Sequence, residues 1–259
     1  MSIQPLTTTD RRAAAPQIRP TASPSPPGGA APLAACNICG GQEFKPGPNQ
    51  RLAQDRIPPR CAACGSFERH RIVRQIFDRV RPSNFARLSA IQFGRDRGIA
   101  GGWFGQFRRA EEDAPANKTP SLSLSLIGLA DASVDVVIAN YLLESQLDYR
   151  AALREMGRVI SDHGFAFIAV QSAHLRKTTQ EVPPAAKDAG DHQRSFGQDL
   201  ETELASLLPD LHVIRVVGRD PATQVEGWGY FITIDDDFAA YLFERQIQAK
   251  FVNIRKIMG

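Results

Sequence analysis

The chain has 259 residues, 31 of them lysine or arginine and 28 aspartate or glutamate, which leaves a formal net charge of +3. A hydrophobic fraction of 42% is enough for a buried core, and the near balance of charge argues against a protein dedicated to polyanions. The longest purely apolar run, residues 165–170, is far shorter than the ~20 residues that span a bilayer. Residues 1–34 also lack the apolar segment of a secretory signal peptide. We therefore expect a cytoplasmic protein with no membrane span.

The first segment, residues 1–34, has the composition of a tail. It holds seven of the 18 prolines, mixed with alanine, serine, threonine and glycine. Such a segment has too few large apolar side chains to offset the entropy cost of ordering it. We predict a disordered Pro/Ala-rich extension.

The four cysteines of the chain form two CxxC pairs, Cys36 with Cys39 and Cys61 with Cys64. This spacing is typical of a zinc site, because each pair places two thiolates on one turn and two turns complete a tetrahedral shell. A redox pair and an iron–sulfur cluster use the same ligands, although a redox pair would not need two equal motifs. We predict a zinc ribbon over residues 35–65, with a closed structural shell.

Residues 66–235 alternate between apolar runs of strand length and amphipathic helical segments. Ser66 is expected to cap a helix that ends before Pro82, and Asp148 is expected to cap another. Strands are expected at 88–93, 134–139, 165–170, 212–217 and 228–234, with a helix over 199–208. This order predicts an α/β fold with a doubly wound sheet and an antiparallel edge strand. Residues 236–259 are expected to form an amphipathic helix that either packs on the domain or forms a homodimer.

Three motifs resemble a known family. Residues 133–144, 150–160 and 164–170 are similar to the strand–helix–strand stretch of class I S-adenosylmethionine (SAM)-dependent methyltransferases. Residues 61–71 and 191–199 are similar to motifs of bacterial methyltransferase-like proteins with an N-terminal zinc ribbon. The resemblance covers about 35–235 and implies a Rossmann-like methyltransferase domain with SAM as its cofactor.

The resemblance also implies which residues bind the cofactor. Its loop after the first strand falls on Phe93, Gly94 and Asp96. Its ribose-binding acidic residue falls among Glu111, Glu112 and Asp113, of which Glu112 is assigned. Asp131 would start the loop over the adenine, with a turn residue as the alternative, and Asn140 would line the pocket at the carboxyl end of a central strand. The sequence departs from the family in having one glycine in the first loop, Ser123 in place of an aspartate, and 141–145 in place of a histidine-flanked motif.

Catalysis is assigned to His192 and Tyr141. Tyr141 would line the pocket beside Asn140, and His192 would act as a general base. His192 and Arg194 together would hold an acidic or sugar substrate, with a surface histidine as the alternative reading. Glu144 is interpreted as a helix-cap or surface carboxylate.

Three functions follow from these observations. The first is SAM-dependent methyl transfer to a small-molecule or glycan-type acceptor. The second is a catalytically degenerate fold that acts as a binding or scaffold protein, favoured by the departures around the cofactor loop. The third is an RNA methyltransferase guided by the ribbon and by the basic residues between Arg51 and Arg81. Because Phe67 and Phe77 fit an apolar core stripe, we interpret the basic segment as a solvated helix face, which makes nucleic acid the less favoured partner.

Overall fold

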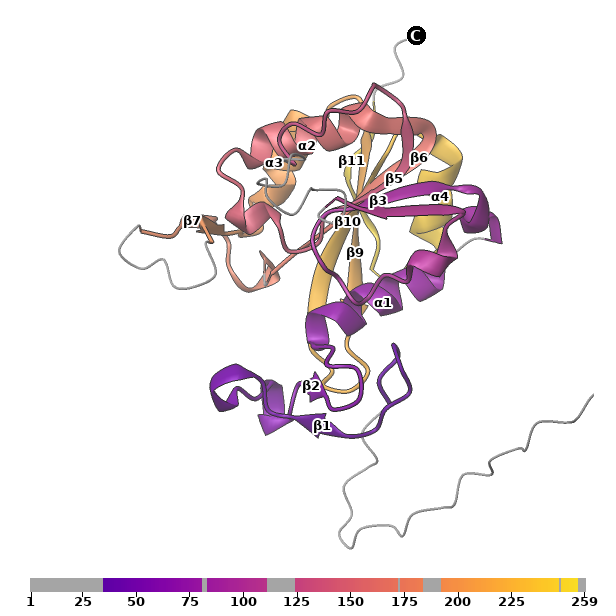
Figure 1. Ribbon diagram of the computed structural model, residues 1–259. Helices are drawn as coiled ribbons and strands as arrows, with labels where there is room; N and C mark the ends of the chain where they lie inside the picture. The colour runs from indigo at the N-terminus through magenta and orange to yellow at the C-terminus, as the bar shows by residue number, and fades with distance from the viewer. Residues whose placement is uncertain are drawn as a thin grey trace, which may run out of the picture. The chain divides into compact units, whose positions relative to one another are not determined.

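The computed structural model describes residues 35–80, 83–110, 124–171, 173–183, 192–246 and 248–255 (Figure 1). The chain divides into two units, Met1–Pro32 and Leu33–Gly259. The predicted tail, residues 1–34, lies outside the described residues. Every helix and strand described below belongs to the second unit.

A seven-stranded sheet forms the centre of this unit, in the order β11-β9-β10-β6-β5-β3-β4. Neighbouring strands run parallel from β4 through β3 and β5 to β6. Strand β10 is antiparallel to β6 and β9, and β11 is antiparallel to β9 at the edge. The bounds are β3 Ser89–Gln92, β4 Gln106–Arg109, β5 Val134–Ile138, β6 Ile160–Val170, β9 His212–Arg219, β10 Glu226–Thr233 and β11 Lys250–Asn253. The predicted α/β fold with an antiparallel edge is confirmed.

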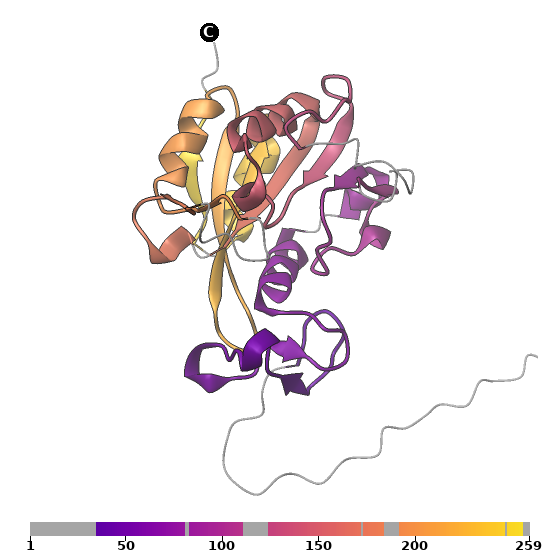
Figure 2. The same cartoon turned by 60° about the vertical axis from the view of Figure 1, so that its left-hand side comes forward.

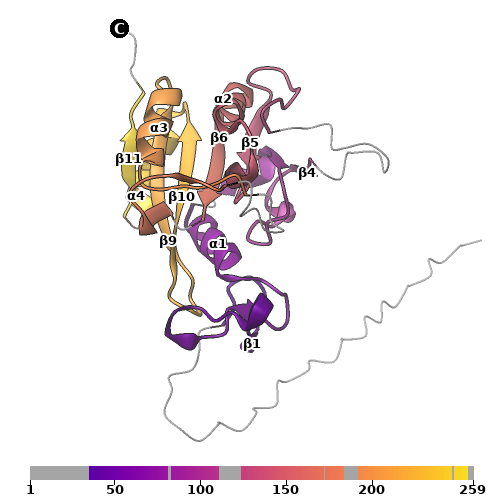
Figure 3. The same cartoon turned by 90° about the vertical axis from the view of Figure 1, so that its left-hand side faces the viewer.

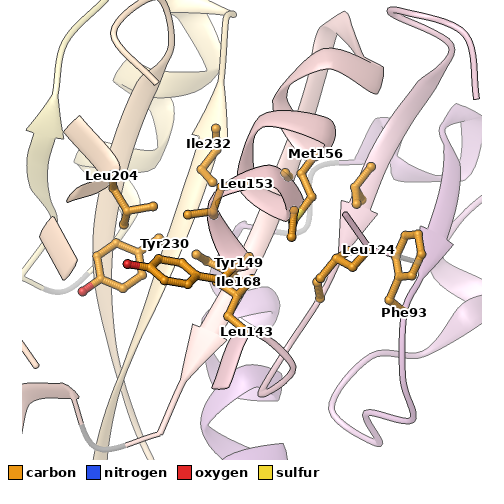
Figure 4. Close-up of a cluster of buried hydrophobic side chains, with 14 of the residues drawn as sticks. Phe93, Leu124, Leu143, Tyr149, Leu153, Met156, Ile168, Leu204, Tyr230 and Ile232 are labelled. Atoms are coloured by element: carbon orange, nitrogen blue, oxygen red, sulfur yellow. The ribbon is translucent and has the colours of Figure 1, made fainter. Parts of the chain in front are cut away.

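Helices cover both faces of the sheet, as Figures 1 and 3 show. Helices α2 (Tyr149–Val159) and α3 (Leu200–Leu207) contribute to one buried cluster, and α1 (Glu68–Val80) and α4 (Asp236–Arg245) to the other. Successive residues of β6 from Phe165 to Val170 alternate between the two clusters, as the pleat requires. Figure 4 shows Leu153 and Met156 of α2 beside Ile168 and Ile232 of the sheet. The sheet is therefore doubly wound.

Two predicted helix ends differ from the structure. The C-terminal helix stops at Arg245, and residues 250–253 form strand β11, where Phe251 pairs with Ile214 of β9. Tertiary pairing with an open sheet edge thus overrides the helical pattern. The predicted cap Ser66 instead turns its hydroxyl toward the cysteines, while the carbonyl of Phe67 accepts the first helical amides. Asp148 does cap α2, accepting from the Ala151 amide at 2.9 Å.

The cysteine module, residues 35–65, lies beside the start of α1 and the turn of the β9–β10 hairpin (Figures 1 and 2). Its two strands, β1 (Phe44–Lys45) and β2 (Arg60–Cys61), pair antiparallel. A second short pair, β7 (Gln180–Glu181) with β8 (Arg194–Ser195), follows β6. Short 3-10 helices cover Pro48–Gln50, Gln54–Arg56, Ser83–Arg87, Gly101–Trp103, Leu143–Ser145 and Ala173–Leu175. Within the described ranges, no helix has the length and apolar character needed to cross a bilayer.

Candidate functional site

The four cysteine sulfurs converge, with one ligand atom from each residue lying within 4.8 Å of all the others. The Sγ atoms of Cys36 and Cys64 are 3.8 Å apart, and those of Cys39 and Cys61 are 3.6 Å apart. A regular tetrahedron with metal–sulfur bonds of about 2.3 Å has sulfur–sulfur edges of about 3.8 Å. The sulfur cluster therefore fits one tetrahedral ion such as Zn²⁺, and all four positions are taken by protein.

Both CxxC pairs sit on the same kind of turn. The Gly40 amide donates to the Cys36 carbonyl at 2.7 Å, and the Gly65 amide donates to the Cys61 carbonyl at 2.9 Å. Both glycines have φ above +70°, where a side chain would be strained. The glycines that follow each pair in the sequence thus allow the backbone to curl around the sulfurs.

The carboxyl ends of β3 and β5 bring together two of the residues assigned to the cofactor. Asp96 accepts from the Asn140 side-chain amide at 2.7 Å and from the Gly98 amide at 2.6 Å. Burial raises the pKa of Asp96 to about 6, although these two hydrogen bonds act in the opposite direction. Phe93 is buried beside them, and Gly94 turns the chain with φ +71°. Asp96 therefore fixes the loop after β3 against the end of β5.

Tyr141 and Glu144 follow Asn140 at the same edge. Tyr141 has φ +58°, a left-handed conformation that is rare for an aromatic residue and typical of functional sites. Its hydroxyl donates to the Arg69 carbonyl at 3.2 Å. Removal from water, together with the carboxylates of Asp96 and Glu144, raises the pKa of Tyr141 well above its usual value. Tyr141 therefore keeps its proton near neutral pH.

The interpretation of Glu144 as a cap or surface carboxylate is wrong. Its side chain is only 2% exposed, and one oxygen accepts from the Gln171 amide at 2.6 Å. Burial raises the pKa of Glu144, while that hydrogen bond and the nearby charges of His192 and Arg194 lower it. Three side-chain oxygens at this edge are buried and have no hydrogen-bond partner among the described residues: Gln92 Oε1, Asn140 Oδ1 and Glu144 Oε2.

His192 and Arg194 occupy different environments. His192 is exposed beside Glu144. Arg194 is buried, donates to the Gln146 carbonyl at 2.5 Å and to Glu181 at 3.1 Å, and lies over the Tyr149 ring. Its guanidinium is occupied by these contacts within the protein. The expectation that Arg194 holds a substrate together with His192 is therefore wrong.

Two cavities lie near the carboxyl ends of the parallel strands, one lined in part by Asp96 and the other by Tyr141. The first, of about 440 Å³, lies between the cysteine module and the loop after β3 and is lined by Ile38, Cys64, Arg95, Asp96, Arg97, Ile99 and Arg109. The second, of about 240 Å³, includes Tyr141 and Gln171 in its lining, together with residues of α1 and β10. Both open at the carboxyl ends of the parallel strands, where sheets of this kind bind ligands.

Two other predicted cofactor residues do not join this cluster. Asp131 precedes β5, so it lies at the opposite, amino edge of the sheet, where it is exposed and pairs with Arg158 at 2.5 Å. Glu112 lies outside the described residues, as does Ser123. Gln92 was not anticipated; a polar residue ending an apolar strand is the signal that identifies it.

Part of the basic segment from Arg51 onward is engaged within the protein. Arg51 pairs with Glu68, Arg74 pairs with Asp78, and Arg71 is fully buried, whereas Arg81 lies outside the described residues. Phe77 is in the core as predicted. Phe67 is not: it is only half-buried and lies beneath the guanidinium groups of Arg51 and Arg69.

Comparison with known proteins identifies one domain. Residues 105–168 match the family of methyltransferase domains, a segment that runs from the start of β4 into β6. The resemblance seen in the sequence motifs is thus confirmed for this part of the chain. No curated protein sequence matches the chain.

Several solved structures similar to this chain are distant methyltransferases. The CMeT domain of a citrinin polyketide synthase is 11% identical over 60% of this chain and 48% of its own, with a TM-score of 0.33. An arsenic (III) SAM methyltransferase from Chlamydomonas reinhardtii is 15% identical over 60% and 65%, with a TM-score of 0.37. A 1,6-didemethyltoxoflavin-N1-methyltransferase from Burkholderia thailandensis is 16% identical over 64% and 79%, with a TM-score of 0.40. This chain spans less than two thirds of the length of the first two.

Proposed function

We propose that this protein binds SAM at the carboxyl edge of β3 and β5 and transfers its methyl group to a small-molecule or glycan-type acceptor. When bound, SAM supplies an electrophilic methyl group on its sulfonium. The family match over residues 105–168 supports the reaction class. The acceptor class is supported by the modest volume of the second cavity, about 240 Å³.

One observation carries the proposal: the unpartnered oxygens of Gln92, Asn140 and Glu144 along this edge. Buried acceptors without a partner are costly, and a ligand rich in hydrogen-bond donors relieves that cost. SAM offers ribose hydroxyls and amino groups as donors. Its carboxylate is suited to a cavity lined by Arg95, Arg97 and Arg109.

The residues at the carboxyl ends of β3 and β5 have different proposed roles in binding and catalysis. Asp96 and Asn140 hold the loop after β3 in place, so the cofactor would meet a preformed wall. Tyr141, which keeps its proton, donates a hydrogen bond to the Arg69 carbonyl and lines the second cavity. His192, exposed beside buried Glu144, is the proposed base for the proton that leaves the acceptor.

We also propose that the sulfur cluster holds a structural Zn²⁺. Four protein ligands leave the ion no open position for chemistry. The Ser66 hydroxyl lies 3.3 Å from the Cys36 sulfur and 3.2 Å from the Cys64 sulfur, so its single proton can be donated to one thiolate of the cluster at a time.

A radiolabel experiment tests the proposed reaction. The zinc-loaded protein is incubated with methyl-labelled SAM and separated small-molecule, glycan and RNA fractions. We expect label in the small-molecule or glycan fraction, and a loss of label with His192→Ala. His163→Ala, an exposed histidine at the amino end of the sheet, is the matched control. Label confined to RNA would overturn the acceptor assignment, and equal rates for His192→Ala and wild type would overturn the role of His192.

A second candidate, a binding protein without catalysis, is favoured by one observation. Residues 93–105 join the parallel strands β3 and β4 with only the short 3-10 helix Gly101–Trp103. Parallel strands are usually connected through an α-helix, whose amino end helps to bind anionic ligands. A SAM-binding measurement distinguishes the two candidates, because the proposed enzyme binds SAM and the non-catalytic binding protein does not.

A further inference from the structure

The second cavity is built from parts of the chain that are far apart in the sequence. Arg51 comes from the cysteine module, and Glu68, Arg69 and Ile72 come from the start of α1. The remaining lining residues come from the segments at the carboxyl ends of β5 and β6 and from the β9–β10 hairpin at the start of β10: Tyr141, Val170, Gln171, Val225, Glu226 and Gly227. The cysteine module therefore forms part of the cavity wall.

The lining carries two positive side chains, Arg51 and Arg69, and two negative ones, Glu68 and Glu226, and three of these four have an ion-pair partner. Arg51 makes two hydrogen bonds of 2.9 Å to the Glu68 carboxylate, and Glu226 pairs with Arg219. Arg69 has no carboxylate within ion-pair distance in the described part of the chain, and its guanidinium lies 5.3 Å from the centre of the Phe67 ring. One positive charge is left to attract an anion.

The remaining lining limits the size and polarity of a ligand. Ile72, Val170 and Val225 present apolar side chains, and Tyr141 adds an aromatic ring. A volume of about 240 Å³ lies below the range of about 300–1,000 Å³ usual for ligand sites. The cavity is thus matched to a small molecule with an apolar body and one anionic group.

We propose that this cavity is the acceptor site and takes a small organic carboxylate, whose charge is met by Arg69. The proposal rests on the proposed function, because it assigns the acceptor of that reaction. It also gives the cysteine module a role beyond stability, since Arg51 and the helix that follows the second CxxC pair shape the site.

The wall on the hairpin side is held closely against α1. A Cβ atom at Gly227 would lie 3.2 Å from Ile72 Cδ1 and 3.3 Å from Ile72 Cγ2. A larger residue at Gly227 would therefore crowd the cavity. Gly102, where a Cβ atom would meet nothing within 4 Å, is a matched control position.

Direct binding tests the proposal without knowledge of the natural acceptor. The zinc-loaded full chain is titrated with benzoate, phenylacetate and hexanoate, with the amide of each acid as its neutral counterpart, and with inorganic phosphate. Binding is followed by ¹⁵N NMR. We expect each acid to bind at least tenfold more tightly than its amide, with the largest shifts at Arg69 and Gly227.

Variants then locate the site. Arg69→Ala is expected to weaken acid binding about ten- to hundredfold, the loss of one charge-assisted hydrogen bond, and Arg69→Lys to retain part of it. Gly227→Val is expected to abolish binding. Arg154→Ala, at an exposed position of α2, and Gly102→Ala should bind like wild type.

Three results would overturn the proposal: acids that bind no better than their amides, acid binding that survives Arg69→Ala, or phosphate that binds more tightly than every acid. SAM titration of the same samples keeps the two proposals separate. Intact SAM binding with no acid binding would remove this inference alone, and acid binding without SAM binding would remove the methyl-transfer function.

Discussion

Arg71 and Asp220, 149 positions apart in the sequence, form a two-pronged ion pair with both nitrogen–oxygen distances at 2.7 Å and both side chains fully buried. Nη2 of Arg71 also donates to the Pro59 carbonyl, and Nη1 donates to the Ser66 carbonyl. Asp220 also accepts from the amide and hydroxyl of Thr223 in the turn before β10. Through Ser66, this network joins the cysteine cluster to the hairpin.

Breaking this pair from one side should be costly, because it leaves a buried charge without a partner. We expect Arg71→Met to lower the free energy of unfolding by about 3–5 kcal/mol, measured by urea denaturation of the zinc-loaded protein. Arg74→Met, which removes a partly exposed pair with Asp78, should cost no more than about 1 kcal/mol. A loss below 1 kcal/mol for Arg71→Met would show that the network does not stabilise the fold.

Loss of one cysteine ligand should release the metal. We expect Cys36→Ser and Cys61→Ser to contain less than one zinc per chain and to melt at a lower temperature, because metal binding contributes free energy of folding. Elemental analysis and thermal melting give the two readouts, with chelator-treated wild type as the control. Metal-free wild type, or an unchanged melting temperature in the variants, would contradict the zinc assignment.

The buried carboxylate of Asp96 should make stability depend on pH. Its pKa of about 6 in the folded protein is raised from 3.8, so the folded state binds the proton more tightly than the unfolded state. This group therefore favours the folded state most at low pH, and that contribution falls as the pH rises from about 4 to about 6.

Asp96→Asn should remove this dependence, because an amide does not titrate in this range. A flip of the Asn140 side-chain amide, which donates to Asp96 in the wild type, would let the Asn140 oxygen accept from the new amide. The stability difference, variant minus wild type, should grow by up to about 3 kcal/mol between pH 4 and 7. Comparing the two proteins cancels the metal's own pH dependence. A difference that stays constant with pH would mean that Asp96 is not buried as a charged group.

Asn140 and Asp131, both predicted to bind the cofactor, lie at opposite edges of the sheet, so substitutions of the two residues show which edge binds SAM. We expect Asn140→Ala to weaken SAM binding about tenfold, the value of one or two hydrogen bonds. Asp131→Ala should leave it unchanged, since Asp131 lies at the amino end of β5 against Arg158. Calorimetry of both variants is the measurement, and stronger weakening by Asp131→Ala would mean that the site lies at the other edge.

The sequence patterns predicted the central strands well, because buried parallel strands need continuous apolar runs such as 134–138 and 165–170. They predicted the cysteine cluster for a similar reason, since tetrahedral ligation restricts the spacing of its ligands. In both cases the structure is determined by the residue types and spacing of the motif itself.

Elsewhere the deciding contacts come from distant parts of the chain. Nothing near Arg71 identifies Asp220 as its partner, and nothing near Lys250 identifies the open edge of β9 that makes 250–253 a strand. The position of Asp131 could have been predicted from the sequence, because a residue that precedes a parallel strand lies at the amino edge of the sheet. Glu144 follows the same strand, and its burial depends on the distant Gln171.

Calorimetric titration of the zinc-loaded protein with SAM and S-adenosylhomocysteine tests the central claim most directly. We expect saturable binding of both in the micromolar range, weakened by Asn140→Ala. Absence of binding heat at several temperatures, in protein shown to be folded and to contain zinc, would contradict the methyltransferase function and leave the non-catalytic binding protein as the better description.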